Sequence, residues 1–210
     1  MNVGGILTDL AIREAVDKGD IAIDPFDARQ LNPASYDLRL GDGVAVYDAW
    51  VKADWVRDAT GVMRPAYDEP LAAKDRVLDA KDEPRIDRFQ IGSDGIVLRP
   101  DVGYLMHTAE RIATKRFVPV LDGKSSLARL FVSVHETAGY GDAGYDGQYT
   151  LEVTVKHPIR LYAGMRIAQI RFHTMHGEVG KLYSGNYTGE TSRGAVASRA
   201  WKQFEKDAGK

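Results

Sequence analysis

The 210-residue sequence contains no cysteine. This absence excludes thiol nucleophiles, iron–sulfur clusters and zinc sites with thiolate ligands. It also excludes the zinc-dependent nucleobase deaminases, whose metal is held by a Pro-Cys-x-x-Cys element. His173 and His176 have a spacing that metal ligands can show, but no third ligand is evident, so two partly exposed imidazoles are the favoured interpretation. The sequence predicts no zinc and no metal ion held by a dedicated side-chain site.

Long apolar runs and a secretory leader are missing as well. No stretch approaches the ~18 consecutive apolar residues of a membrane span. Residues 1–30 lack the basic start, apolar middle and small-residue cleavage site of a signal peptide. We therefore expect a cytoplasmic protein with no membrane partner. The length fits one domain, residues 1–210, and the 44% of hydrophobic residues can supply its core.

An excess of positive charge is also lacking. The formal net charge is −2, which gives no general electrostatic case for a nucleic-acid partner. The charge is uneven, because residues 156–210 hold 10 Lys or Arg against 4 Asp or Glu. That basic quarter is either a surface that gathers phosphate or a solvated tail, and composition alone does not decide between them.

Little helix is indicated, and strands dominate. A helix is expected from Thr8 to Lys18, where Thr8 can cap the first turn and Gly19 stops the last one. From Ile96 onward, strand-like segments recur at short intervals between Gly or Pro, which is typical of a β-barrel or jelly roll. The expected strands are 35–41, 95–100, 103–112, 116–123, 127–137, 148–155, 159–163 and 166–174.

Two regions are less regular. We expect residues 44–95 to form a variable insertion of loops and hairpins, with a short helix before Pro84. Residues 183–210 begin with many Gly, Ser and Thr residues, a composition that suits a mobile tail or lid that orders on a ligand.

The most informative stretch runs from Gly123 to Glu152 and reads GKSSLARLFVSVHETAGYGDAGYDGQYTLE. It combines serines, an arginine, a histidine and carboxylates within a glycine-punctuated, strand-like sequence. Burying such polar groups is costly. A site for a polar, phosphorylated ligand is the simplest reason to build it.

Five segments resemble the dCTP deaminase family of the trimeric dUTPase superfamily. They are LNPASYDLRLG, GKSSLARL, VHETAGYGDAGYDGQYTLE, GMRIAQIRF and RGAVASR, in the family's order along nearly the whole chain. The resemblance implies a mainly β subunit, a distorted jelly roll or β-barrel of the dUTPase-like type. It also implies a homotrimer with active sites between subunits, and hydrolytic removal of the cytosine amino group without a metal at the base.

The proposed chemistry requires a proton carrier. Deaminating cytosine needs water added at C4, a proton delivered to N3 and ammonia expelled. Without zinc, a carboxylate must take the proton of the water and return it to the departing amine. Glu152 lies among apolar residues in TLEVTV, and partial burial there would raise its pKa. The competing interpretation is an ordinary strand glutamate that faces solvent.

The resemblance implies catalytic roles for three further residues. Ser125 and the backbone carbonyl of Ala138 would hold the attacking water. Arg129 would hold Ser125 in position and would also set the charge near Glu152. His135 would shape the substrate site without transferring protons.

Substrate contacts follow from the same resemblance. The carboxylate of Asp142 would accept a hydrogen bond from the 3′-hydroxyl, and the ring of Tyr145 would pack on the deoxyribose. The competing interpretation of GDAGYDG is a plain β-turn. The phosphates would meet Lys124, Ser126 and Gln169, and Tyr183 would add a hydroxyl. A Mg²⁺ ion would bridge the phosphate oxygens, held largely by nucleotide and water.

The sequence departs from the family pattern in three places. Lys124 stands where arginine is usual, which gives a point charge without the bidentate fork. Phe131 replaces a common glycine. The tail lacks the usual Lys-Tyr-x-x-Gln. Glu190 in this region would repel phosphate unless its side chain points away, and Arg193 could compensate for that repulsion.

Three functions are compatible with these observations. The first is a dCTP deaminase that releases dUTP and ammonia for pyrimidine deoxynucleotide supply. The alternative is a bifunctional enzyme that gives dUMP and pyrophosphate, with Asp142 as the base for the second water. A pure dUTPase is another form of this alternative, but such enzymes lack the equivalent of Glu152, so the presence of Glu152 argues against a pure dUTPase. The third is a non-catalytic β-scaffold that binds a nucleotide.

Overall fold

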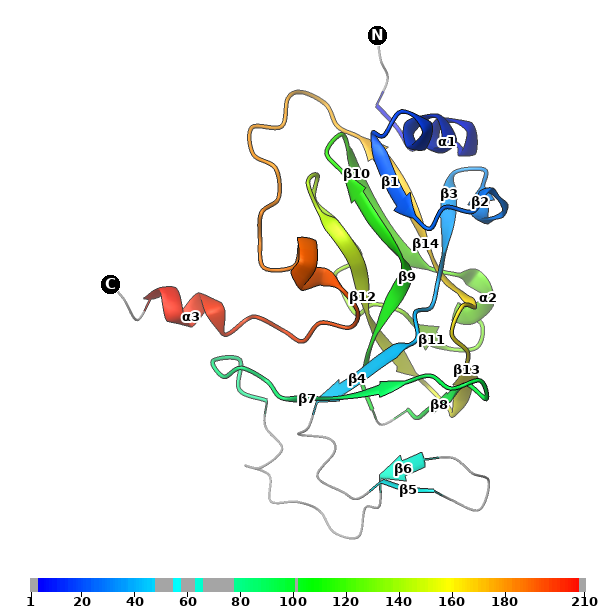
Figure 1. The fold of residues 1–210 in the computed structure, drawn as a ribbon, viewed down its shortest axis with the longest axis vertical. Helices are drawn as coiled ribbons and strands as arrows, with labels where there is room; N and C mark the ends of the chain where they lie inside the picture. Colours follow the sequence, from blue (N-terminus) through cyan, green and yellow to red (C-terminus); the bar gives the residue numbers. More distant parts are fainter. Residues whose placement is uncertain (1–3, 48–54, 58–62, 66–77, 101, 208–210) are drawn as a thin grey trace.

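The computed structural model describes residues 4–47, 55–57, 63–65, 78–100 and 102–207 (Figure 1). Its helical elements are α1 (Asp9–Asp17), η1 (Ala28–Gln30), α2 (Ser125–Ala128), η4 (Gly189–Ser192) and α3 (Lys202–Asp207). Its strands are β1 (Ile21–Asp24), β2 (Leu31–Asn32), β3 (Ser35–Arg39), β4 (Gly43–Tyr47), β5 (Trp55–Arg57), β6 (Met63–Pro65), β7 (Ile86–Gln90), β8 (Ile96–Leu98), β9 (Tyr104–Thr114), β10 (Phe117–Gly123), β11 (Val132–Ser133), β12 (Asp146–Val155), β13 (Ile159–Leu161) and β14 (Arg166–Thr174). The predicted mainly β fold with an N-terminal helix is confirmed.

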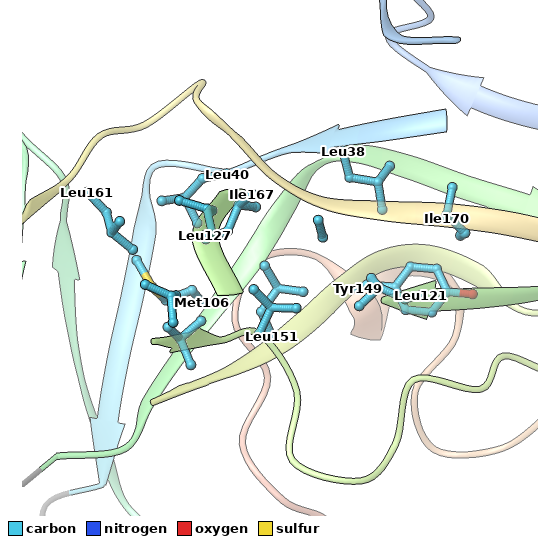
Figure 2. Close-up of a cluster of buried hydrophobic side chains, with 14 of the residues drawn as sticks. Leu38, Leu40, Met106, Leu121, Leu127, Tyr149, Leu151, Leu161, Ile167 and Ile170 are labelled. Atoms are coloured by element: carbon cyan, nitrogen blue, oxygen red, sulfur yellow. The ribbon is translucent and has the colours of Figure 1, made fainter. Parts of the chain in front are cut away.

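Two larger antiparallel sheets enclose the core. The six-stranded sheet has the order β11-β12-β9-β4-β7, with β1 also paired to β9, and the four-stranded sheet has the order β10-β14-β3-β2. Alternation along each strand decides which side chains turn inward. Figure 2 shows Leu151 of β12, Ile170 of β14 and Leu38 of β3 meeting between the sheets. Full burial of each such side chain stabilises the fold by about 1.5–3 kcal/mol.

Helix α1 begins and ends as the sequence predicts. The hydroxyl oxygen of Thr8 accepts a hydrogen bond from the backbone N–H of Ala11, which satisfies one otherwise free donor of the first turn. Ile12 and Ala15 are buried against the core. Gly19 follows the helix with φ +75°, a conformation that glycine adopts without steric cost.

The strand expected over 127–137 is wrong. Instead, Lys124 accepts backbone hydrogen bonds from Leu127 and Ala128, which starts the short helix α2, and only the two residues of β11 pair with β12. Phe131 has φ +55° between these elements, a left-handed conformation that costs a non-glycine residue about 1–2 kcal/mol. This conformation explains why a glycine is suited to the position.

Parts of the predicted 44–95 insertion belong to the main sheet. Strands β4 and β7 pair with each other, and Ala45 of β4 also pairs with Leu105 of β9. Strands β5 and β6 form a hairpin. Residues 78–84 of the helix predicted before Pro84 form a turn and extended chain, and residues 72–77 lie outside the described residues.

The C-terminal segment crosses the outer face of β12 (Figure 1). The backbone N–H of Gly194 donates to Oε1 of Gln148 at 2.8 Å, and that of Val196 donates to Oγ1 of Thr150 at 3.1 Å. The segment therefore docks on the side of the six-stranded sheet that faces away from the core. In the part of the chain that the structure describes, no helix is long and apolar enough to cross a bilayer.

Candidate active site

Glu152 occupies a sheltered position on β12. Alternation places its neighbours Leu151 and Val153 in the core and turns Glu152 to the outer face, where it is half-buried. Burial raises the pKa of its carboxyl above the ordinary value of 4.5. Hydrogen bonding from backbone N–H groups, including that of Glu136, and the nearby His135 oppose that rise in part. The carboxyl is thus not fully solvated, and no lysine or arginine of the described residues is among the groups that shift its pKa.

The C-terminal segment covers the sheet beside Glu152. Across the strands, Glu152 is in register with Leu105, and Leu105 with Ala45. Ala195 of the C-terminal segment packs on these two residues. The hydroxyl of Tyr47, next along this face, accepts a hydrogen bond from the backbone N–H of Ser198. The tail thereby limits access of water to this part of the face.

His135 lies near Glu152 and packs closely on the loop that carries Ala138. A Cβ atom at Gly139 would lie 2.4 Å from the carbonyl oxygen of Leu121 and 3.0 Å from Nε2 of His135, so only glycine allows this approach. Nδ1 of His135 is buried without a hydrogen-bond partner among the described residues. Its hydrogen-bonding capacity is therefore not used by the described part of one subunit.

Ser125 and Arg129 lie together on the surface. Nη1 of Arg129 donates to the backbone carbonyl of Ser125 at 3.0 Å, so Arg129 contacts the main chain and not the serine hydroxyl. Both side chains are exposed at α2. Within the described part of the chain, no hydrogen bond joins α2 to Glu152, and the charges that shift the pKa of Glu152 are those of His135 and Glu136. One subunit does not bring these three predicted catalytic residues together.

The predicted sugar site forms an aromatic cluster around Tyr145. Its ring lies 4.6 Å from that of Tyr149 and 6.2 Å from that of Tyr183, measured between centroids. Its hydroxyl donates to the carbonyl of Gln148 and contacts Oγ of Ser192, and burial raises its pKa to about 12. The structure therefore brings Tyr145 and Tyr183 together.

Asp142 begins the turn that leads into this cluster. The backbone N–H of Tyr145 donates to the carbonyl of Asp142 at 3.1 Å, and Gly144 has φ +99°. The Asp142 side chain is exposed. The motif is thus a true β-turn, and its carboxylate remains accessible to a ligand.

The predicted phosphate residues Lys124 and Gln169 meet at the four-stranded sheet. Nε2 of Gln169 donates to the carbonyl of Gly123 at 3.1 Å, directly before Lys124. Nζ of Lys124 lies 2.6 Å from Oδ1 of Asp37, whose side chain is 1% exposed. Ser126 of α2, two positions after Lys124 in the sequence, is exposed.

Asp37 was missed by the sequence reasoning. It is the acidic residue of SYDLRLG, a segment in which only the strand alternation was used. Besides Lys124, it binds Nδ2 of Asn32 at 2.9 Å and Nη1 of Arg166 at 3.3 Å. An aspartate in the middle of a short strand, where propensity disfavours it, was the available signal.

Arg193 lies apart from these phosphate residues. It lines an open cavity of about 440 Å³ between the sheet and the C-terminal segment, together with Asp24, Arg111 and Gln148. Lys124, Ser126 and Gln169 do not line that cavity. The structure thus separates Arg193 from the other predicted phosphate contacts within one chain.

The described residues contain no group of three His, Asp or Glu side chains that could hold a metal ion. Lys124 and Arg166 engage the carboxylate of Asp37 on the predicted phosphate side.

A family model described as dCTP deaminase-like matches residues 6–175. The chain belongs to the dCTP deaminase-like family. The predicted resemblance is thereby confirmed.

Two similar proteins named "dCTP deaminase, dUMP-forming" match most of the chain. That of Clostridium acetobutylicum is 36% identical over 199 residues, which cover 95% of this chain and 98% of the relative. That of Leptospira biflexa is 37% identical over 187 residues, covering 89% and 91% respectively.

A solved structure supports the fold of this family. The 2′-deoxycytidine 5′-triphosphate deaminase of Agrobacterium tumefaciens aligns with a TM-score of 0.57 and 25% identity. The alignment covers 82% of this chain and 49% of that one, so the present chain spans about half the length of the solved protein. The predicted dUTPase-like fold class is confirmed.

Proposed function

We propose that this protein hydrolyses dCTP to dUMP, ammonia and pyrophosphate, consuming two water molecules. The observation that carries the proposal is the half-buried carboxyl of Glu152 with a raised pKa, in a chain of the dCTP deaminase-like family. Release of dUTP is the first expectation from the sequence. The relatives named dUMP-forming favour its alternative, the bifunctional reaction.

Glu152 would act as the proton carrier of the deamination. Its carboxylate takes a proton from water as the oxygen adds to C4, and passes that proton to N3. The carboxylate then takes the proton of the new hydroxyl and gives it to the departing amine. A carboxylate whose pKa is raised by burial is a stronger base than a fully solvated one, so it takes a proton from water more readily. His135, beside it, would contact the base.

The second hydrolysis would take place at the phosphates. Water attacks the α-phosphorus and pyrophosphate leaves, with Asp142 as the base for this water. Asp142 is exposed on a defined turn beside the Tyr145 and Tyr183 rings, a position compatible with binding the deoxyribose as well. Lys124, Ser126 and Gln169 would hold the phosphates, and a Mg²⁺ ion on the phosphate oxygens would offset their charge.

We further propose that the working enzyme is a homotrimer. Ser125 and Arg129 are exposed, and within one subunit they make no contact with Glu152. An active site between subunits would supply Ser125 and Arg129 from one chain and Glu152 from the next.

A product assay in ¹⁸O-labelled water tests the proposal. With dCTP and Mg²⁺, we expect ammonia, pyrophosphate and dUMP in equal amounts, with ¹⁸O at O4 of uracil and one further ¹⁸O on a product phosphate. Ammonia and dUTP without pyrophosphate would exclude the second hydrolysis. An absence of reaction with dCTP, dCDP and dCMP would overturn the whole proposal.

A further inference from the structure

The carboxylate of Asp37 is shared by two cationic side chains. Nζ of Lys124 lies 2.6 Å from Oδ1, and Nη1 of Arg166 lies 3.3 Å from Oδ2. Asn32 adds a hydrogen bond to Oδ1 at 2.9 Å. A buried carboxylate needs one opposite charge to offset its desolvation. With two, this cluster carries one positive charge more than it needs, on side chains that reach solvent.

Arg166 is placed to present this additional positive charge to a ligand. It stands at the start of β14, and its side chain is 49% exposed. Nη1 donates to Asp37 and Nη2 donates to the carbonyl of Arg29 at 3.0 Å. A guanidinium has five N–H donors in a planar fork. These two contacts orient the fork and leave donors for a further acceptor.

The neighbours of Arg166 are the residues proposed to bind phosphate. Gln169 lies on the same strand, and its Cα is in register with Asp37 on β3 and with Asp122 on β10. Its side chain donates to the carbonyl of Gly123, next to Lys124. The cluster therefore gathers an ammonium, a guanidinium and a carboxamide around one buried carboxylate.

We propose that Arg166 is a further phosphate-binding residue of the nucleotide site and that Asp37 is its positioning residue. Lys124 offers phosphate only a point charge, whereas Arg166 offers a guanidinium that can bind two oxygens at once. Lys124 would supply charge and Arg166 would supply paired hydrogen bonds, and Asp37 positions both side chains. This inference rests on the proposed function, since it deepens the site that would receive the triphosphate.

Binding of tripolyphosphate, which has no base or sugar, tests this role without catalysis. Calorimetric titration should show Arg166→Gln weakening the affinity about tenfold, the loss expected for one charge-assisted contact. Arg166→Lys keeps the charge and loses the fork, so it should fall between that variant and the wild type.

Arg116→Gln is the matched control. Arg116 also places Nη1 at 3.3 Å from an aspartate, Asp20, but its side chain is 68% exposed and lies away from Lys124. This variant should bind tripolyphosphate as the wild type does. Melting temperatures of all variants report whether the fold is intact. A purely structural role of Arg166 would lower the melting temperature and leave the affinity for tripolyphosphate unchanged.

Steady-state kinetics with dCTP separates this inference from the proposed function. Arg166→Gln should raise KM about tenfold and leave kcat within about twofold. If the wild type deaminates dCTP and Arg166→Gln has unaltered KM and tripolyphosphate affinity, the role of Arg166 is refuted while the proposed function stands. If the wild type has no activity but its tripolyphosphate affinity depends on Arg166, the proposed function fails and the phosphate contact remains. Absence of tripolyphosphate binding to the wild type would overturn the inference.

Discussion

Two of the carboxyl groups that lie in strands, those of Glu152 and Asp37, have opposite surroundings. Glu152 of β12 is half-buried beside His135 and Glu136, and burial raises its pKa. Asp37 of β3 is fully buried and bears contacts from Lys124 and Arg166. In the part of the chain that the structure describes, no lysine or arginine is among the groups that shift the pKa of the first carboxyl. The second is in contact with two cationic side chains.

The difference indicates different tasks. A carboxyl that accepts and returns a proton must be able to change its charge, and a permanent ion pair would prevent this. A carboxyl that positions cations for a phosphate must stay charged. The proposals made above accordingly put proton transfer on the β12 face and phosphate binding on the β3 and β14 face. The following changes test that assignment.

The largest effect is expected for Glu152→Gln. The amide keeps the shape of the side chain but cannot carry a proton, so ammonia release should fall by about 10³-fold, within the range of general acid–base catalysis. Ammonia is measured with dCTP at saturation. Glu14→Gln, on the exposed surface of α1, is the matched control and should retain full activity. A comparable rate for Glu152→Gln and the wild type would show that Glu152 is not the proton carrier.

Asp37→Asn should have the next largest effect. It leaves Lys124 and Arg166 without their shared anion, so we expect a loss of about 3 kcal/mol in the free energy of unfolding, the lower end of the range for breaking a buried pair. Urea denaturation measures this loss. Asp27→Asn breaks the exposed pair with Arg29 and should change stability little. Equal stability of Asp37→Asn and the wild type would contradict the central role of Asp37.

The two carboxyls also differ in how far the sequence could predict them. The place of Glu152 on a strand between two inward-facing neighbours could be predicted from the alternation in TLEVTV, while its proposed chemistry comes from the family resemblance. Asp37 was not predicted, because its partner Lys124 is 87 residues away and strand pairing alone brings the two together. The misassigned strand at 127–137 has a similar cause. Its apolar residues suit a strand, but the backbone of Lys124 starts a helix there.

A smaller effect, and a sharper test of Glu152, is the dependence of deamination on pH. Only the carboxylate form can take a proton from water, so kcat/KM should fall tenfold per pH unit on the acid side. Because burial raises the pKa of Glu152, this fall should begin above pH 4.5. Rates are compared from pH 4 to 8 with the stability of the fold monitored in parallel. An acid limb with an apparent pKa below 4.5 would mean that another group controls the rate.

The smallest effect is on stability, and it has an unusual sign. The folded pKa of Glu152 is raised above its unfolded value, so the folded state binds the proton more tightly and stability falls as pH rises from 4.5 through the folded pKa. At pH 7 the ionised carboxyl therefore destabilises the fold slightly, and Glu152→Gln, which cannot ionise, should melt at a higher temperature than the wild type. Near pH 4 the difference should vanish. Asp37→Asn should show the opposite, a lower melting temperature at pH 7. If both variants lowered the melting temperature at pH 7, the two carboxyls would both be structural anions, and the division of tasks between the two faces would be lost.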